Sequence, residues 1–155
     1  MKNKVKAKLK VDKDFILFEE ASALKELEFD EFCYAIHDYG YLIPRITVLN
    51  KPKFRNSTMN IGYISKTCTA PTYAQAFRWF RERYDLWGWI TPIKTEGKER
   101  QHYFEIVNEG KVFTSPEFIG GMSLYMEDTE KEWNTYEEAE LACLRKLIEI
   151  VKNKK

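Results

Sequence analysis

Two stretches of similar design decide the fold of this chain: residues 72–84, which read TYAQAFRWFRERY, and residues 135–152, which read TYEEAELACLRKLIEIVK. Each begins with a threonine and has Gln75 or Glu138 three residues later, so the two side chains can satisfy free backbone N–H groups at a helix start. Apolar residues follow at helical spacing, on a narrow stripe in the first stretch and over a wider arc in the second. We therefore predict two main helices, of which the second is the more deeply buried.

The segments around these helices read as shorter elements. Residues 19–28 have the apolar spacing of a short N-terminal helix, and residues 33–37 and 41–49 read as two strands joined by the turn Asp38-Tyr39-Gly40. This order of elements predicts an α+β fold, a small antiparallel sheet with both main helices packed on it. Three further strand-like runs supply that sheet, at residues 86–93, 102–107 and 117–126.

The size and composition of the chain favour one domain. It has 155 residues, of which 44% are hydrophobic and 15% aromatic, enough to bury a sizeable core. We expect residues 1–155 to form a single domain whose ends, residues 1–3 and 153–155, are frayed. No apolar run approaches the length that spans a bilayer and no signal peptide is visible, so a soluble protein of the cytoplasm is expected. Three widely separated cysteines fit reduced thiols in such a compartment.

Charge is sorted by segment, although the formal net charge is only +1. No Asp or Glu occurs between Tyr39 and Arg81, a stretch that carries seven cations, whereas residues 14–38 hold eight acids and one lysine. At the N-terminus lysines alternate with apolar residues, which predicts a strand over residues 4–11. Its lysine face is typical either of an edge strand guarded against aggregation or of a basic arm that touches phosphates.

The acid-free stretch supplies the candidate functional site, because it places cations beside aromatic residues such as Phe54 and Tyr63 in a long irregular segment. We expect a protein partner to bind there; the alternative is a single-stranded nucleic acid or RNA, since cations bind phosphates and aromatic faces stack on bases. Purely structural roles are the other interpretation: the cations neutralise the acids of residues 14–38 within the fold, and Trp79 packs in the core. The candidate partner-binding or anion-binding residues are Lys51, Lys53, Arg55, Lys66, Arg78, Trp79 and Arg81.

Cys33 and His37 are the one pair with catalytic or metal-binding chemistry. They are four residues apart and would share one face of a strand, so a thiolate and an imidazole could meet there. His102 is the only other histidine, and no CxxC, HxxxH or HExxH spacing and no glycine-rich phosphate loop is present. A buried cysteine and a hydrogen-bonded histidine are the simpler interpretation. We therefore expect no catalytic residue, no metal and no cofactor.

Both helix starts, residues 72–76 and 135–139, resemble those of uncharacterised small proteins of gut-bacterial phages and mobile elements. The resemblance implies a non-enzymatic accessory protein that acts inside a bacterial host on a host macromolecule, with host defences as one target. It implies no mechanism, because no activity is established for that family, and it leaves the partner's identity and the oligomeric state open. The likeness also covers Trp79-Phe80-Arg81-Glu82, Ala142 and the portion from Phe18 to Pro44, but neither the Lys-rich start nor the acidic segment 117–133.

Overall fold

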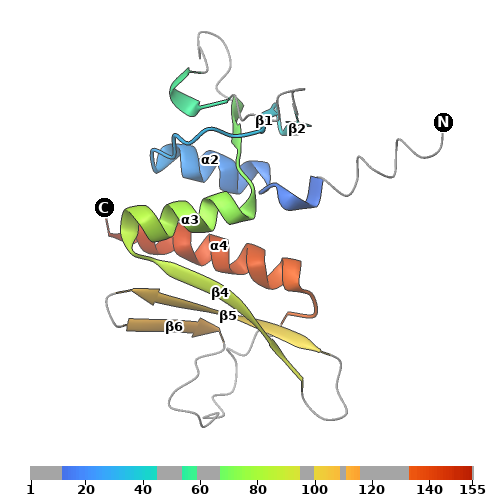
Figure 1. The fold of residues 1–155 in the computed structure, drawn as a ribbon, viewed down its shortest axis with the longest axis vertical. Coiled ribbons are helices and arrows are strands. Elements are labelled where there is room, and N and C mark those ends of the chain that lie inside the picture. The colour runs from blue at the N-terminus through green and yellow to red at the C-terminus, as the bar shows by residue number, and fades with distance from the viewer. Residues whose placement is uncertain are drawn as a thin grey trace, which may run out of the picture. The chain divides into compact units, whose positions relative to one another are not determined.

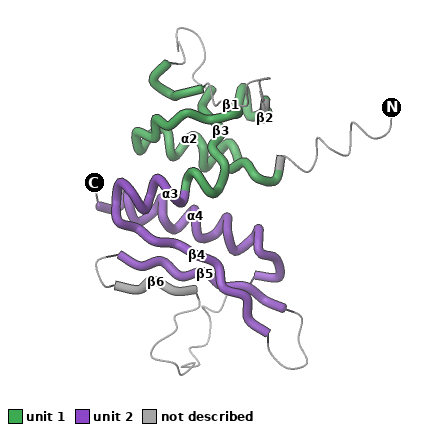
Figure 2. Tube along the Cα trace, in the orientation of Figure 1, with its two compact units in different colours: residues 1–76 green, residues 77–155 purple. Residues whose placement is uncertain are grey.

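The structure, a computed structural model, describes residues 12–44, 54–58, 67–94, 100–108, 111–115 and 133–154. The chain divides into two compact units, residues 1–76 and residues 77–155 (Figure 2). Each unit has its own three-stranded antiparallel sheet and is described by itself (Figure 1). The strands predicted over residues 4–11 and 117–126 lie outside the described residues.

The first unit combines a helix with a sheet of order β2-β1-β3. Helix α2 packs against β3, and the apolar face that the sequence pattern assigns to it, Ala21, Leu24 and Leu27, is buried. This is the predicted N-terminal helix. The elements of the unit are the 3-10 turn η1 (Asp12–Asp14), α2 (Phe18–Glu26), β1 (Ala35–Asp38), β2 (Tyr41–Pro44), the 3-10 turn η2 (Asn56–Thr58) and β3 (Thr67–Ala70).

Helix α2 ends in a residue with left-handed backbone. Glu28 has φ 69°, its N–H donates to Lys25 O at 3.0 Å, and the N–H of Phe29 donates to Leu24 O at 2.9 Å. This is the Schellman pattern, in which the chain reverses and packs back on the last helical turn. Leu24 and Phe29 are both buried, as that packing requires. The reversal delivers the chain to Asp30, which carries the polar network described below.

The β1–β2 hairpin turns at the predicted position. Tyr39 and Gly40 have φ 49° and 82°, and Asp38 pairs with Tyr41, so the loop is a two-residue turn of type I′. A glycine suits this turn because it adopts positive φ without the steric cost of a Cβ atom. Strand β3 pairs antiparallel with the other side of β1, which sets His37 opposite Cys68.

The second unit contains a sheet of order β4-β5-β6 and the main helices. Helix α4 lies along one face of the sheet, in contact with β4 and β5 (Figure 1). Gly88 permits this close approach, because a Cβ atom there would lie 2.9 Å from Cys143 Sγ and 3.1 Å from Phe77 Cε1. The elements are α3 (Tyr73–Tyr84), which begins in the last residues of the first unit, β4 (Trp87–Ile93), β5 (Gln101–Asn108), β6 (Lys111–Ser115) and α4 (Tyr136–Asn153).

Both predicted capping boxes form. The N–H of Gln75 donates to Thr72 Oγ1 at 3.2 Å while the N–H of Thr72 donates to Gln75 Oε1 at 3.1 Å. At α4 the N–H of Glu138 donates to Thr135 Oγ1 at 3.2 Å, and the N–H of Thr135 donates to Glu138 Oε2 at 3.3 Å. The predicted α+β fold and both main helices are confirmed, with the strands divided between two small sheets. The sequence pattern misses β6, because it places the next strand only at residue 117.

Candidate functional site

The seven candidate residues fall in different parts of the chain. Three of them, Lys51, Lys53 and Lys66, lie outside the described residues. Arg55 belongs to the first unit, whereas Arg78, Trp79 and Arg81 lie on the part of α3 that belongs to the second. The surroundings of each described candidate are therefore given within its own unit.

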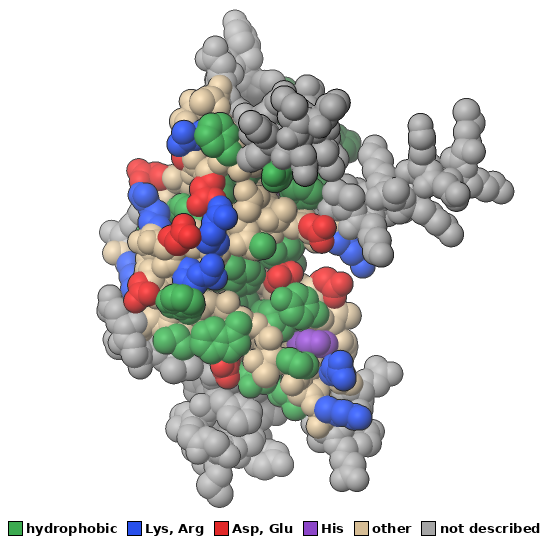
Figure 3. All heavy atoms as spheres, viewed as in Figure 1, with side chains coloured by type: hydrophobic (Ala, Val, Ile, Leu, Met, Phe, Trp, Pro, Cys, Tyr) green, Lys and Arg blue, Asp and Glu red, His purple; other side chains and the backbone are tan. Residues whose placement is uncertain are grey.

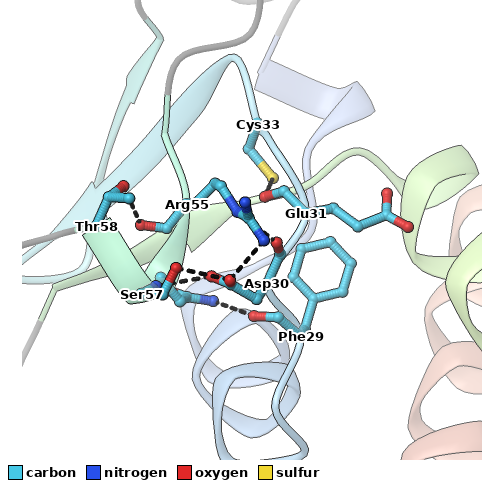
Figure 4. A network of polar contacts seen from close by, with 8 residues as sticks. Phe29, Asp30, Glu31, Cys33, Arg55, Ser57 and Thr58 are labelled. Atoms are coloured by element: carbon cyan, nitrogen blue, oxygen red, sulfur yellow. Dashed lines mark hydrogen bonds and ion pairs between the residues drawn. The ribbon is translucent and has the colours of Figure 1, made fainter.

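Arg55 is part of a polar network built on Asp30 (Figure 4). Its Nη2 lies 2.8 Å from Asp30 Oδ2, its Nε donates to the backbone carbonyl of Asp30 at 2.9 Å, and its guanidinium lies 4.9 Å from the centroid of the Phe32 ring. Ser57 donates to the same carboxylate from its backbone N–H at 2.7 Å and from Oγ at 2.6 Å. Burial alone would raise the pKa of Asp30, but the Ser57 hydrogen bonds and the charge of Arg55 outweigh it and lower that pKa.

Asn56 fixes this network to the core of the first unit. Its side chain is buried, donates from Nδ2 to Phe29 O at 2.7 Å, and accepts from the N–H of Thr69 at 3.0 Å. One amide therefore bonds to the end of the α2 turn and to a β3 backbone group at once. Arg55 thus has a structural role in which its charge is largely matched by Asp30.

Arg78 and Trp79, neighbours on α3, differ in exposure. Arg78 Nε lies 3.9 Å from Glu82 Oε1 in an exposed pair one helical turn apart, an arrangement of little energetic consequence. Trp79 is only 6% exposed and packs edge to face against Phe80 and Tyr84, with ring centroids 5.1 and 5.2 Å away. Trp79 is therefore a packed residue, as the core interpretation of the sequence has it.

Arg81 contacts an exposed tryptophan at the junction of α3 and β4. Its guanidinium lies 5.2 Å from the centroid of the Trp87 ring, and the indole N–H of Trp87 donates to Asp85 Oδ1 at 2.9 Å. Asp85 has φ 52° and ends the helix, and Asn108 Nδ2 donates to the carbonyls of Tyr84 and Asp85, each at 3.2 Å. Trp87 is thus held in one orientation from two sides while 49% of it stays exposed.

Trp89 lies on the same face of β4 and is 42% exposed. Side chains alternate along a strand, so Trp87 and Trp89 share the face opposite to Gly88, whose neighbour is α4. The register places Glu105 of β5 directly opposite Trp89. We name Arg81, Asp85, Trp87, Trp89 and Glu105 the tryptophan surface. Figure 3 shows hydrophobic side chains exposed among charged ones on the face of the second unit that is turned to the viewer.

Sequence reasoning identifies one member of the tryptophan surface, Arg81, and misses the rest. The signal that could have found the others is the triplet Trp87-Gly88-Trp89 in a predicted strand. A glycine between two tryptophans at period two means that one face of the strand allows close packing while the other holds two large rings. The predicted cation next to aromatic rings is present, but the ring it contacts lies on β4 rather than in the acid-free stretch.

The described thiols are held in their neutral form. Cys33, Cys68 and Cys143 are all buried, and burial raises the pKa of Cys33 to about 12 and that of Cys68 to about 11, and raises that of Cys143 further. A nucleophilic or metal-binding cysteine needs its thiolate, which these surroundings disfavour. Within the described ranges, no group of three His, Cys, Asp or Glu side chains is placed to hold a metal ion.

His37 is a buried histidine of the first unit. Its Nε2 lies 2.8 Å from the carbonyl of Ile16, which can only accept, so Nε2 carries the proton. Burial lowers the pKa of His37, although the Ile16 carbonyl and the carboxylate of Glu20 act in the opposite direction. The neutral ring packs edge to face on Phe18, 5.8 Å between centroids. The register sets His37 opposite Cys68, and the buried cysteine and hydrogen-bonded histidine of the simpler interpretation are present.

Comparison with protein-family models, with curated proteins and with solved structures finds no match to this chain. None of the helices in the described part of the chain is both long and apolar enough to cross a membrane.

Proposed function

We propose that the protein is a non-enzymatic binding protein that engages another protein through the tryptophan surface of its second unit. In keeping with the resemblance of its helix starts, we propose an accessory protein of a phage or mobile element whose partner is a protein of the bacterial host, with host defence proteins as candidates. The observation that carries the proposal is the pair of exposed indoles, Trp87 and Trp89, on one face of β4.

The composition of the tryptophan surface is that of a binding hot spot. Trp and Arg are enriched in interface hot spots. Trp brings a large contact area with few rotatable bonds, and Arg brings a charged group that also stacks on aromatic rings. Trp87 is ordered before any partner arrives, since Asp85 holds its N–H and Arg81 covers one face of its ring. An anchor fixed in advance loses less conformational entropy on binding than a mobile one.

The absence of an enzymatic role is supported by the chemistry of the buried thiols and His37. A nucleophile must be deprotonated and reach its substrate, and the described cysteines combine burial with a raised pKa. His37 uses its N–H for the Ile16 carbonyl, so this proton is engaged in structure.

Binding to single-stranded nucleic acid is the second candidate, favoured by the contact of Arg81 with an indole on an exposed sheet face. Two carboxylates count against it. Asp85 lies at the Trp87 indole N–H and Glu105 lies opposite Trp89, where they would repel a phosphate backbone. A protein partner avoids this conflict.

The proposal is tested by capture of partners from a bacterial lysate, with and without nuclease, using the wild type and a Trp87→Ala/Trp89→Ala variant. We expect a protein that is retained after nuclease treatment and lost with the double variant. Tyr136→Ala is the matched control, since Tyr136 is an equally exposed aromatic residue on α4. Equal capture by the double variant would reject the tryptophan surface, and a signal removed by nuclease would favour nucleic acid.

The basic stretch needs a separate variant. Reversing the charge of Arg55 would place two acids together in the Asp30 network and disturb the fold, so its effect on binding could not be interpreted. Lys51→Glu/Lys53→Glu is therefore the variant to use for the candidate residues of the acid-free stretch. We expect it to weaken capture of the host protein, and an unchanged capture would remove these lysines from the binding surface.

A further inference from the structure

Two indoles of the tryptophan surface have different surroundings. Trp87 has a cation, Arg81, against its ring and a carboxylate, Asp85, at its N–H. Trp89 has a carboxylate directly opposite in the register, Glu105. Among the residues that the structure describes, no cation or aromatic ring stacks on Trp89, and no side chain forms a hydrogen bond or ion pair with Glu105. Trp89 therefore has a carboxylate beside it that no described cation balances.

Among the described strands, β4 also has a free edge to which another strand can add. Within the described ranges β4 pairs with β5 alone, so one side of β4 is a sheet edge. Pro92, opposite His102, has no N–H and must occupy a position that does not donate to β5. Gly88 and Ile90 have the same phase along the strand, so their N–H and C=O groups point away from β5. These groups can pair with an extended segment.

We propose, building on the function proposed above, that the partner presents an extended segment that adds beside β4 and places a lysine or arginine side chain on Trp89 and next to Glu105. The backbone of the segment pairs with Gly88 and Ile90. Its side chains repeat every second residue, the same spacing that separates Trp87 from Trp89. The cation balances the Glu105 carboxylate and stacks on the indole, as Arg81 does on Trp87.

Charge complementarity selects this occupant. An acidic segment would meet Glu105 and Asp85, and a purely apolar one would bury the Glu105 carboxylate without a counter-charge, which is costly. A helical segment would leave the N–H and C=O groups of Gly88 and Ile90 without partners. A basic extended segment satisfies the indole, the carboxylate and the strand edge together.

The test is selection of a displayed random linear peptide library against the full-length chain. We expect enriched peptides with lysine or arginine at alternate positions. The best peptide is then measured by fluorescence anisotropy against wild type, Trp89→Ala, Glu105→Gln and the control Tyr136→Ala. Loss of one cation–indole contact predicts about tenfold weaker binding for Trp89→Ala, a smaller loss for Glu105→Gln and no change for Tyr136→Ala.

Methylating alternate backbone nitrogens of the same peptide tests strand addition, because it removes the N–H donors that face β4. We expect binding to be lost when one alternate set is methylated and kept when the other set is. Two results would overturn the inference: enriched peptides without lysine or arginine, or affinities of Trp89→Ala and Glu105→Gln for the peptide that equal that of the wild type. If these results appear while the lysate partner still depends on Trp87 and Trp89, the proposed function stands and only the basic extended segment is rejected.

Discussion

Each unit of the chain places an arginine over an aromatic ring, and the two pairs differ in what surrounds them. In the first unit Arg55 lies 4.9 Å from the Phe32 centroid, and in the second Arg81 lies 5.2 Å from that of Trp87. Arg55 is also bound to Asp30 through both its charge and a backbone carbonyl. No described carboxylate forms an ion pair with Arg81. An arginine–aromatic pair therefore stabilises the fold in the first unit, whereas in the second it is part of the exposed tryptophan surface.

A cation beside an aromatic ring therefore indicates a binding surface only where no carboxylate of the fold forms an ion pair with that cation. Asp30 lies 25 residues before Arg55 in the sequence and reaches it because α2 reverses at Glu28. The network around Asp30 is then completed by Ser57 and Asn56. Beside Arg81, the Asp85 carboxylate accepts from the Trp87 indole, which fixes the ring, and no described carboxylate forms an ion pair with Arg81.

The largest loss of stability is expected from a change of Asn56, which fixes the Arg55–Asp30 network to the core of the first unit. Asn56→Ala removes an amide that serves Phe29 O and the N–H of Thr69, both away from solvent. Loss of two hydrogen bonds of a buried amide should lower the free energy of unfolding of the first unit by about 1–3 kcal/mol. Urea unfolding together with amide hydrogen exchange of β3 measures this.

Thr58→Ala is the matched control for Asn56, because Thr58 belongs to the same turn but is exposed and bonds only to Arg55 O. Its cost should stay below about 1 kcal/mol. Equal costs for the two variants would show that the turn, rather than the Asn56 amide, holds the segment.

A second prediction concerns how the tryptophan surface is positioned. Gly88→Ala places a Cβ atom 2.9 Å from Cys143 Sγ, so β4 or α4 must shift, and the second unit should lose about 1–3 kcal/mol of stability. Cys143→Ala removes the sulfur and should restore part of that loss in the double variant. Additive costs in a double-mutant cycle would mean that the clash is elsewhere and that Gly88 does not set the approach of α4 to the strand.

The elements that sequence reasoning identifies correctly are those set by local chemistry. The capping residues Thr72 and Thr135 mark both helix starts, and Tyr39-Gly40 marks the hairpin, because each depends on neighbours within a few residues. The role of Trp79 could not be predicted that way. Its indole lies off the apolar stripe of α3, so the pattern leaves its burial open; in the structure it is buried and packs edge to face on Phe80 and Tyr84.

The exposure of Trp87 and Trp89 depends in the same way on tertiary structure. The alternation of β4 places both rings on one face, but which face meets solvent is decided by the side on which α4 packs. Likewise, the register that brings Glu105 opposite Trp89 is set by the pairing of β4 with β5. Sequence alone gives the pattern and not the covered side.

The third prediction compares the two arginines directly. Arg55→Ala loses a backbone hydrogen bond and leaves the Asp30 carboxylate with fewer donors, so it should cost about 1–2 kcal/mol of stability. Arg81→Ala loses an exposed cation–indole contact and should cost at most about 0.5–1 kcal/mol. Thermal and urea unfolding give both values. A cost for Arg81→Ala that exceeds that for Arg55→Ala would reverse the assignment of structural and surface roles.

The smallest effect is a difference in pH dependence between the same two variants. The pKa of Asp30 is lowered from its ordinary value of 3.8, so its ion pair and hydrogen bonds stabilise the folded state above that value. This contribution is lost as the pH falls through the lowered pKa. The cost of Arg55→Ala should therefore shrink when unfolding is measured well below pH 3.8, whereas the cost of Arg81→Ala should stay the same because an indole does not titrate. Parallel decreases for both variants would show that acid weakens the whole chain and not the Asp30 network in particular.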